Sequence, residues 1–408
     1  MGVSFTSGRQ RLVVPEASTV TSLRHRNRSL VLRHIILARE TTRAKLGRLC
    51  DLSPASVTKL VGELIAEGLV QENGSVASRG GRPIALIGPR PEAAYSVGAD
   101  MGERGVAVEL FDLTMNRVDR EFRGGREQED AETIAHDLSD AIAALRERNP
   151  QAWTRLLGVG VGLPGLVETD ADGKQVLYAQ SLGWPPVPVE RLVTADAPVF
   201  AENGAKTQAK AELWFGAAHE VEHCLVALLG RGVGLGVVSD GRLTHGYAGS
   251  ATEWGHTKVE RGGRPCRCGG HGCVEAYAGS DAILTAWRDQ GGVFDGTGWR
   301  AIGAFLEAAE TDPAAARLRD EVIDTLGIGL ANMVNLTNPQ RIIIGGWVGL
   351  RLMERLAEPL EQAIRKHSLL RPGAQFDLRP STFGGDAVAL GAAIMPVEAM
   401  IAAETTAT

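Results

Sequence analysis

Three cysteines near residue 270 form the most chemically specific pattern in the chain. Cys266, Cys268 and Cys273 lie within the segment CRCGGHGC, which also contains three glycines. Glycine permits the tight turns that let ligands so close in sequence surround one ion. Three thiolates and one further ligand make a tetrahedral zinc site, so the spacing predicts bound zinc. The alternative is a reduced thiol cluster without metal, which would be prone to oxidation.

The bulk composition indicates a soluble protein of two or three domains. The chain has 408 residues, of which 44% are hydrophobic and 23% charged. No apolar run approaches the roughly 20 residues needed to span a bilayer, and the first residues lack the apolar core of a signal peptide. We therefore expect a cytoplasmic protein with no membrane contact. In that compartment, clustered cysteines favour metal over disulfides.

Charge is distributed unevenly along the chain. Residues 1–90 contain 14 Lys and Arg against 6 Asp and Glu, whereas the remainder contains 29 against 43. A basic N-terminal part on an acidic body suggests that the N-terminal part meets a polyanion such as nucleic acid. Chance composition would produce the same asymmetry, so charge alone leaves both readings open.

The basic part also has the helix pattern of a helix-turn-helix. Helical periodicity begins near Asn27, and a second short helix fits residues 42–50. Ser53 is a natural N-cap for a third helix, and Pro54 suits its first position because the missing N–H costs nothing there. Gly68 is expected to end this helix.

Two short strands should follow the third helix and form a wing. They are expected at 69–72 and 84–87, around an Asn73-Gly74 turn and the basic segment 78–83. In such a motif the start of the last helix enters the major groove. The alternative is a small helical domain that binds protein. The residues expected to contact DNA are Ser53, Ala55, Ser56, Thr58, Lys59, Arg79 and Arg82.

From Tyr95 onward the pattern changes to strands that end in glycine-rich turns, mixed with helices. Examples are 95–113, 156–168, 224–243 and 341–346. This alternation predicts α/β structure with ligands at the strand ends. Each glycine loop alone is weak evidence, because such turns are common in any α/β protein.

The order of these segments resembles the ROK family of sugar kinases and repressors, from about Asn27 to Glu398. The NRSLVLRHI opening, the LSPASVTKLVGELIAEGLV helix and the SRGGRP wing resemble the regulator branch. The resemblance implies an α/β protein, with an N-terminal winged helix-turn-helix and a two-lobed actin-like ATPase (ribonuclease H-like) fold. The expected division is a basic tail at 1–25, a DNA-binding domain at 26–88, and a sugar-sensing domain at 89–400 whose second lobe spans about 200–375.

Three positions depart from the pattern of the family kinases. Arg104 replaces the threonine of the Asp-x-Gly-x-Thr phosphate loop, and Arg231 replaces the threonine of the second loop. Gly204 stands where the kinases have the aspartate that takes the proton from the sugar hydroxyl. Glycine has no side chain to act as a general base. We therefore expect no kinase activity and poor ATP binding. Both arginines are expected in surface salt bridges, with anion binding as the alternative.

The resemblance also implies the ligands of the two expected sites. His256, in the segment EWGH, would be the fourth zinc ligand, with His271 as the alternative. Four protein ligands leave no open position, so the zinc would be structural. Glu202 is a weaker candidate for the sugar, and each glutamate taken alone would be read as a surface residue. The expected sugar-facing set is Asn203, Glu253, His256 and Glu275.

These features together predict a DNA-binding transcription regulator, a repressor of carbohydrate uptake or metabolism genes. A sugar or sugar derivative would modulate its affinity for the double-stranded operator, and a homodimer or homotetramer is expected. Two alternatives remain open at this point. One is an ATP-dependent sugar kinase with an accessory domain, and the other is a regulator controlled by a protein of a sugar-uptake system.

Overall fold

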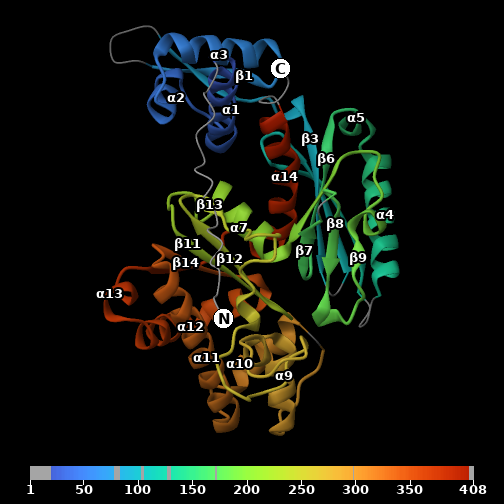
Figure 1. Ribbon diagram of the computed structural model, residues 1–408, viewed down its shortest axis with the longest axis vertical. Helices are drawn as coiled ribbons and strands as arrows, with labels where there is room; N and C mark the ends of the chain where they lie inside the picture. Colours follow the sequence, from blue (N-terminus) through green and yellow to red (C-terminus); the bar gives the residue numbers. More distant parts are fainter. Residues whose placement is uncertain are drawn as a thin grey trace, which may run out of the picture. The chain divides into compact units, whose positions relative to one another are not determined.

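The chain is divided into two compact units, Met1–Pro89 with Ala399–Thr408 and Arg90–Glu398 (Figure 1). The computed structural model describes residues 20–77, 83–102, 105–125, 130–170, 172–296 and 298–403.

In the first unit, helices precede an antiparallel pair of strands. Apolar side chains from all three helices form its core, among them Ile35, Leu46 and Leu64, which are fully buried. The elements are α1 (Val20–Ala38), α2 (Arg43–Cys50), α3 (Pro54–Ala66), β1 (Val70–Val76) and β2 (Ile84–Pro89).

The expected N-terminus of the third helix is confirmed. The Ser53 side chain accepts a hydrogen bond from the Ser56 backbone N–H at 3.2 Å, and Pro54 is the first helical residue. The first helix, in contrast, begins at Val20 rather than near Asn27. Its opening turns are polar and show no apolar periodicity, but Arg24 reaches Glu63 of α3 at 2.6 Å. The opening turns of α1 are thus supported by an ion pair with a residue 39 positions later in the chain, which the local sequence pattern does not reveal.

The predicted turn at Asn73-Gly74 is wrong. Strand β1 continues to Val76, and its pairing register with β2 shifts between Glu72 and Gly74. Gly74 has φ 121°, a conformation that favours glycine and that occurs in β-bulges as well as in turns. The segment that joins the strands contains Arg79 and Arg82, which lie outside the described residues.

The second unit contains two lobes whose central sheets share one topology. In the first, β3, β4 and β5 are successive antiparallel neighbours, and β6 and then β10 add in parallel beside β3. In the second, β11, β12 and β13 are antiparallel, and β14 and then β15 add in parallel beside β11. This repeated plan confirms the α/β class and the expected two-lobed, actin-like architecture.

The first lobe has helix α4 packed on the sheet face beside β4 and β5 (Figure 1). A small antiparallel sheet, β7-β8-β9, accompanies it. Its elements are β3 (Tyr95–Gly102), β4 (Gly105–Asp112), β5 (Arg117–Gly124), α4 (Ala131–Arg148), α5 (Pro150–Trp153), β6 (Leu156–Leu163), β7 (Leu166–Thr169), β8 (Gln175–Tyr178), β9 (Val187–Pro188), α6 (Val189–Leu192) and β10 (Val199–Asn203).

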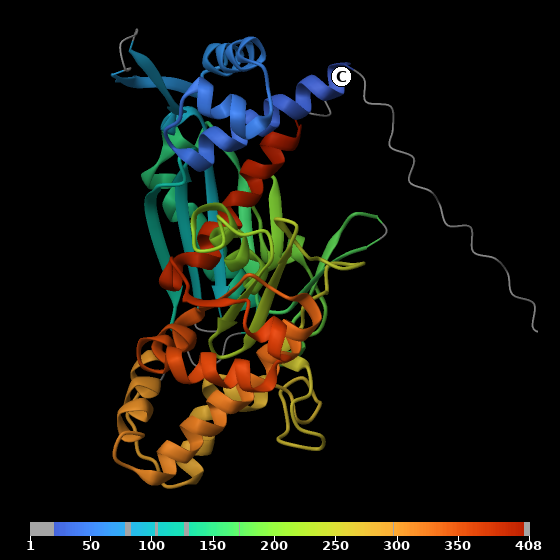
Figure 2. The ribbon, with the colours of Figure 1, turned by 90° about the vertical axis from the view of Figure 1, so that its left-hand side faces the viewer.

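In the second lobe, α7 packs on β11 and β12, while α11 and α12 pack side by side, in orange in Figure 2. Its elements are α7 (Gly204–Phe215), β11 (Cys224–Leu229), β12 (Val233–Ser239), β13 (Arg242–Leu243), α8 (Glu275–Ala278), α9 (Ser280–Asp289), α10 (Trp299–Ala308), α11 (Pro313–Thr337), β14 (Arg341–Gly345), α12 (Gly346–His367), α13 (Leu370–Gly373) and β15 (Asp377–Pro380).

The last helix, α14 (Ala387–Ala403), is strongly apolar. Among the described residues, the segment Gly384–Ala403 is long and apolar enough to cross a membrane by length and composition, contrary to the expectation from the sequence. Within the fold, 61% of its apolar window is buried by the rest of the chain. A core helix of a globular protein has this character.

Candidate functional site

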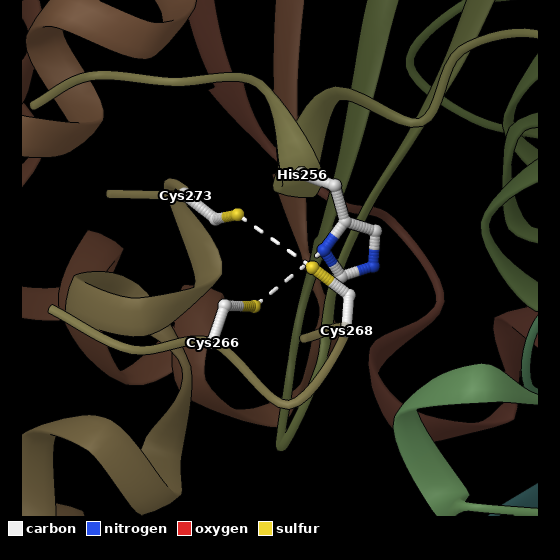
Figure 3. A group of neighbouring side chains, drawn as sticks. All are labelled: His256, Cys266, Cys268 and Cys273. Atoms are coloured by element: carbon white, nitrogen blue, oxygen red, sulfur yellow. Dashed lines mark hydrogen bonds between the residues drawn. The ribbon is translucent and has the colours of Figure 1, made fainter. Parts of the chain in front are cut away.

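Four side chains with metal-binding atoms converge beside the short helical turn Trp254–His256 (Figure 3). They are His256, Cys266, Cys268 and Cys273, whose ligand atoms all lie within 4.8 Å of one another. The Cys266 sulfur lies 3.7 Å from His256 Nδ1, and the sulfurs of Cys268 and Cys273 are 3.8 Å apart. The cluster can therefore hold a metal ion. The rival ligand His271 is exposed and is not part of the group.

The loop that carries the cysteines is closed by its own backbone. The Cys266 N–H donates to the Gly270 carbonyl at 2.8 Å, and the Gly269 N–H donates back to the Cys266 carbonyl at 2.9 Å. Gly272 has φ 71°, and a side chain there would collide with the Glu260 carbonyl. Glycine at this position is thus a requirement of both conformation and space.

The donor set fits zinc in its chemistry and in its spacing. Three sulfurs and one imidazole are ligands that zinc prefers, and a tetrahedron with Zn–S bonds of about 2.3 Å places the sulfurs about 3.8 Å apart. The observed separation of the Cys268 and Cys273 sulfurs is 3.8 Å. Burial raises the pKa of the Cys266 thiol to about 12, so a bound cation would be needed to keep that sulfur ionised.

A cavity of about 360 Å³ adjoins the cluster and is lined by residues from both lobes of the second unit. His256 belongs to the cluster and also lines this cavity. The structure thus brings together all four residues of the expected sugar-facing set, Asn203, Glu253, His256 and Glu275.

The side chains of Asn203 and Glu275 are engaged by backbone groups of the protein. The Asn203 side-chain oxygen accepts the Ala205 N–H at 2.9 Å and so caps α7, while its amide donates to the Gly165 carbonyl at 2.8 Å. One carboxylate oxygen of Glu275 accepts the Val233 N–H at 3.1 Å. These bonds hold both side chains in place at the cavity wall.

Glu253 is a carboxylate whose charged form is disfavoured by its surroundings. Burial raises its pKa, the ammonium group of Lys206 opposes that shift, and the charge of Glu275 adds to it. Glu202, the weaker candidate, does not line the cavity. Its carboxylate instead lies 3.1 Å from the His245 ring and 3.8 Å from the Lys206 ammonium group.

The sequence reading missed two cations of this region. Lys206 is almost completely buried, and its ammonium group donates to the Gly249 carbonyl. Glu202 belongs to β10 and Lys206 to α7, so their ion pair crosses a strand–helix junction and helical spacing does not predict it. Arg267, between two cysteines of the loop, lines the cavity and lies 3.5 Å from Glu275. Nothing in the local sequence indicates which way that arginine points.

Two of the positions that depart from the kinase pattern, Gly204 and Arg231, line the cavity. A Cβ at Gly204 would meet its neighbours only at 3.7–3.9 Å, which is ordinary van der Waals contact. Arg231 forms the expected salt bridge, with Asp281 at 2.6 Å. Arg104 lies outside the described residues. Burial, together with Glu109 and Asp386 and against Arg120, raises the pKa of cavity residue Asp100 to about 7.

In the first unit, α3 has one apolar face and one exposed face. Val57, Leu60 and Leu64 are buried. Ser53 and Ser56 bond to each other through their hydroxyls at 2.9 Å. The exposed residues include every described member of the expected DNA-contacting set, namely Ser53, Ala55, Ser56, Thr58 and Lys59.

Comparison with known proteins finds a ROK family match and relatives of two kinds. The family model matches residues 96–398. The chain is 31% identical over 392 residues to the xylose repressor of Caldicellulosiruptor bescii, and the match covers 93% of this chain and 98% of the repressor. The crystal structure of a ROK family transcriptional regulator, a homologue of the E. coli MLC protein, superposes with a TM-score of 0.73. It is 25% identical and covers 94% of this chain and 99% of its own.

A kinase of the same family is similar over a shorter part of the chain. The ROK family glucokinase from Streptomyces griseus, solved with glucose and AMPPNP, superposes with a TM-score of 0.63 at 26% identity. That match covers 99% of the glucokinase but 74% of this chain.

Proposed function

Since the chain belongs to the ROK family, we propose that it is a DNA-binding transcription regulator, a repressor of genes for carbohydrate uptake or metabolism. The observation that carries this proposal is the extent of the similarity. The repressor and the regulator match over 93–94% of the chain, including its basic N-terminal unit, whereas the glucokinase match covers 74%.

The exposed face of α3 is the proposed DNA-reading surface. Its small and polar side chains offer no bulk that would block the major groove, and Lys59 supplies a cation that can reach a phosphate or a guanine edge. The arginines of the wing would add phosphate contacts. A homodimer or homotetramer would let two such surfaces bind two operator half-sites.

We propose that the cavity beside the metal cluster binds a sugar or sugar derivative. Glu253 and Glu275 can each accept hydrogen bonds from neighbouring hydroxyls. A structural zinc ion held by His256 and the three cysteines would fix the cysteine loop, which leads directly to Glu275 in the cavity wall. Ligand binding between the lobes would then shift the population of conformations that bind the operator.

The proposed regulator has no kinase activity. Gly204 carries no base, and a phosphoryl transfer depends on several positioned groups at once. The retained Asp100 and the similarity to the glucokinase favour the alternative of an ATP-dependent sugar kinase. A coupled assay of sugar-dependent ADP formation distinguishes the two readings, because only the kinase turns over.

The proposed function is tested by fluorescence anisotropy on DNA from upstream of the protein's own and neighbouring genes. The titrations are run alone and with xylose, glucose and other pentoses and hexoses. Specific binding that one sugar weakens or strengthens is the expected result. Specific binding that no sugar alters would contradict sugar sensing, and absence of specific binding would overturn the regulator assignment. The matched variants are Lys59→Ala on α3 and Lys366→Ala, an exposed lysine of α12.

A further inference from the structure

A lysine that is not a metal ligand lies directly against the cysteine cluster. Lys258 follows His256 by two residues, and its ammonium group donates to the Cys273 sulfur at 2.8 Å. The backbones of these two residues also form an isolated antiparallel bridge. The Val259 N–H next to it donates to the Gly272 carbonyl at 2.8 Å. The lysine is therefore held to the cysteine loop by main-chain as well as side-chain contacts.

The ammonium group occupies the space above Gly270. A Cβ added at Gly270 would lie 2.6 Å from the Lys258 nitrogen, 3.5 Å from the Cys268 sulfur and 3.8 Å from the Cys273 sulfur. The φ of Gly270 is outside the left-handed region, so its backbone conformation does not require glycine. Glycine at position 270 leaves space beside its Cα, and the ammonium group of Lys258 occupies that space.

A cation beside the cysteines can offset the negative charge of the metal-loaded cluster. Three thiolates, one neutral imidazole and a divalent ion carry a net charge of about −1. An ammonium group that donates to a thiolate offsets this charge through a charge-assisted hydrogen bond. A carboxylate oxygen of Glu275 lies 3.8 Å from the Cys266 sulfur and adds negative charge there. Lys258 is the cation at the Cys273 side.

We propose that Lys258 is a positioning residue of the metal centre. It donates a hydrogen bond to the thiolate of Cys273, balances the negative charge of the cluster and so retains the ion. This inference rests on the proposed zinc site and adds to it a residue outside the ligand set. It also gives a reason for glycine at position 270 that the zinc spacing alone does not supply.

The test uses the full-length chain and begins with its metal content, measured by elemental analysis. Zinc transfer to a chromogenic chelator is then followed at fixed pH for Lys258→Met, Lys258→Arg and Gly270→Ala. Lys174→Met, at an exposed lysine of another loop, is the control. We expect transfer about tenfold faster for Lys258→Met, in the range known for residues that support metal ligands. Lys258→Arg should restore most of the difference.

Gly270→Ala displaces the ammonium group without removing the lysine. It should therefore also speed zinc transfer, and the Lys258→Met/Gly270→Ala double variant should be no faster than Lys258→Met. The cobalt-substituted proteins supply a readout that a purely structural role would not move. Loss of the hydrogen bond to the thiolate should shift the sulfur-to-cobalt charge-transfer band to lower energy in Lys258→Met and Gly270→Ala, and not in Lys174→Met.

The outcomes distinguish a failure of the proposed zinc site from a failure of the proposed role of Lys258. A wild-type chain that binds neither zinc nor cobalt would remove the zinc site, and the role of Lys258 with it. A wild-type chain that holds zinc, with Lys258→Met unchanged in transfer rate and in the cobalt band, would overturn the role of Lys258 alone. If circular dichroism shows that Lys258→Met does not fold, the zinc-transfer rate and cobalt band of Gly270→Ala test the role of Lys258 instead, and unchanged values would overturn it.

Discussion

The sulfur of Cys266 lies 3.8 Å from a carboxylate oxygen of Glu275, so the metal cluster and the wall of the cavity are in direct contact. The other carboxylate oxygen of Glu275 accepts the Val233 N–H at the end of the glycine turn before β12. Through this one side chain, the cysteine loop, the cavity and the central sheet of the second lobe are linked. A change in the metal cluster should therefore alter the position of Glu275 in the cavity wall.

The two histidines near the cysteines should differ sharply in their effect on metal binding. His256→Ala removes a ligand atom from the cluster, whereas His271→Ala alters an exposed side chain outside it. We expect His256→Ala to retain zinc at least about tenfold more weakly and to melt at a lower temperature, because metal binding contributes to folding. Zinc content after dialysis against a chelator measures this. Equal zinc retention by the two variants would contradict the assignment of His256.

Truncation of Lys59 should weaken DNA binding without unfolding the first unit. The side chain is exposed on α3, away from the buried residues Val57 and Leu60. We expect Lys59→Ala to weaken specific binding about tenfold and, if the contact is to a phosphate, to reduce the salt-dependence slope by about 1. Anisotropy titrations at several salt concentrations measure both quantities. An affinity equal to that of Lys366→Ala would rule out contact between Lys59 and DNA.

Restoring an aspartate at position 204 should not restore a kinase. A Cβ at Gly204 would meet only ordinary contacts, and the position is the first residue of α7, where an acidic group interacts favourably with the helix N-terminus. We expect Gly204→Asp to fold with a stability within about 0.5–1 kcal/mol of wild type. No sugar-dependent ADP formation is expected, since Arg231 still occupies the second phosphate loop. Turnover by the wild-type chain would refute the loss of catalysis, and turnover by the variant alone would show that Gly204 was its single cause.

The contribution of Asp100 to the stability of the second unit should fall as the pH rises from about 4 to about 7. Burial raises the pKa of Asp100 from 3.8 to about 7, so the folded chain binds the additional proton in this window and the unfolded chain does not. The unfolding free energy contributed by this group is therefore largest at low pH and is lost as Asp100 ionises. Asp100→Asn removes this dependence and should be more stable than wild type at pH 8 by about 1–2 kcal/mol.

Urea unfolding monitored by tryptophan fluorescence measures this effect in the correct unit. All seven tryptophans lie between residues 153 and 347, within Arg90–Glu398. Asp172→Asn, at an exposed turn of the same unit, is the control. If Asp100→Asn and Asp172→Asn show the same pH dependence between pH 4 and pH 8, the carboxylate of Asp100 is not the group that titrates.

Local signals predicted a large part of this structure correctly. The N-cap at Ser53 and the proline after it define the start of α3, because capping depends on residues within one helical turn. The same kind of signal failed at Asn73-Gly74, where glycine serves a bulge inside β1 and not a turn. It also failed at the start of α1, whose polar first turns are supported by the ion pair between Arg24 and Glu63.

The sequence by itself predicted the cluster of three cysteines and the apolar face of α3. Each of these depends on residue type and on spacing of a few residues. The resemblance favoured His256 over His271, and the structure groups His256 with the cysteines. Only the tertiary structure buried Lys206 and set Lys258 against Cys273. These relationships join side chains from separate turns and loops. Their distances depend on how the whole second unit packs, and no local pattern contains that information.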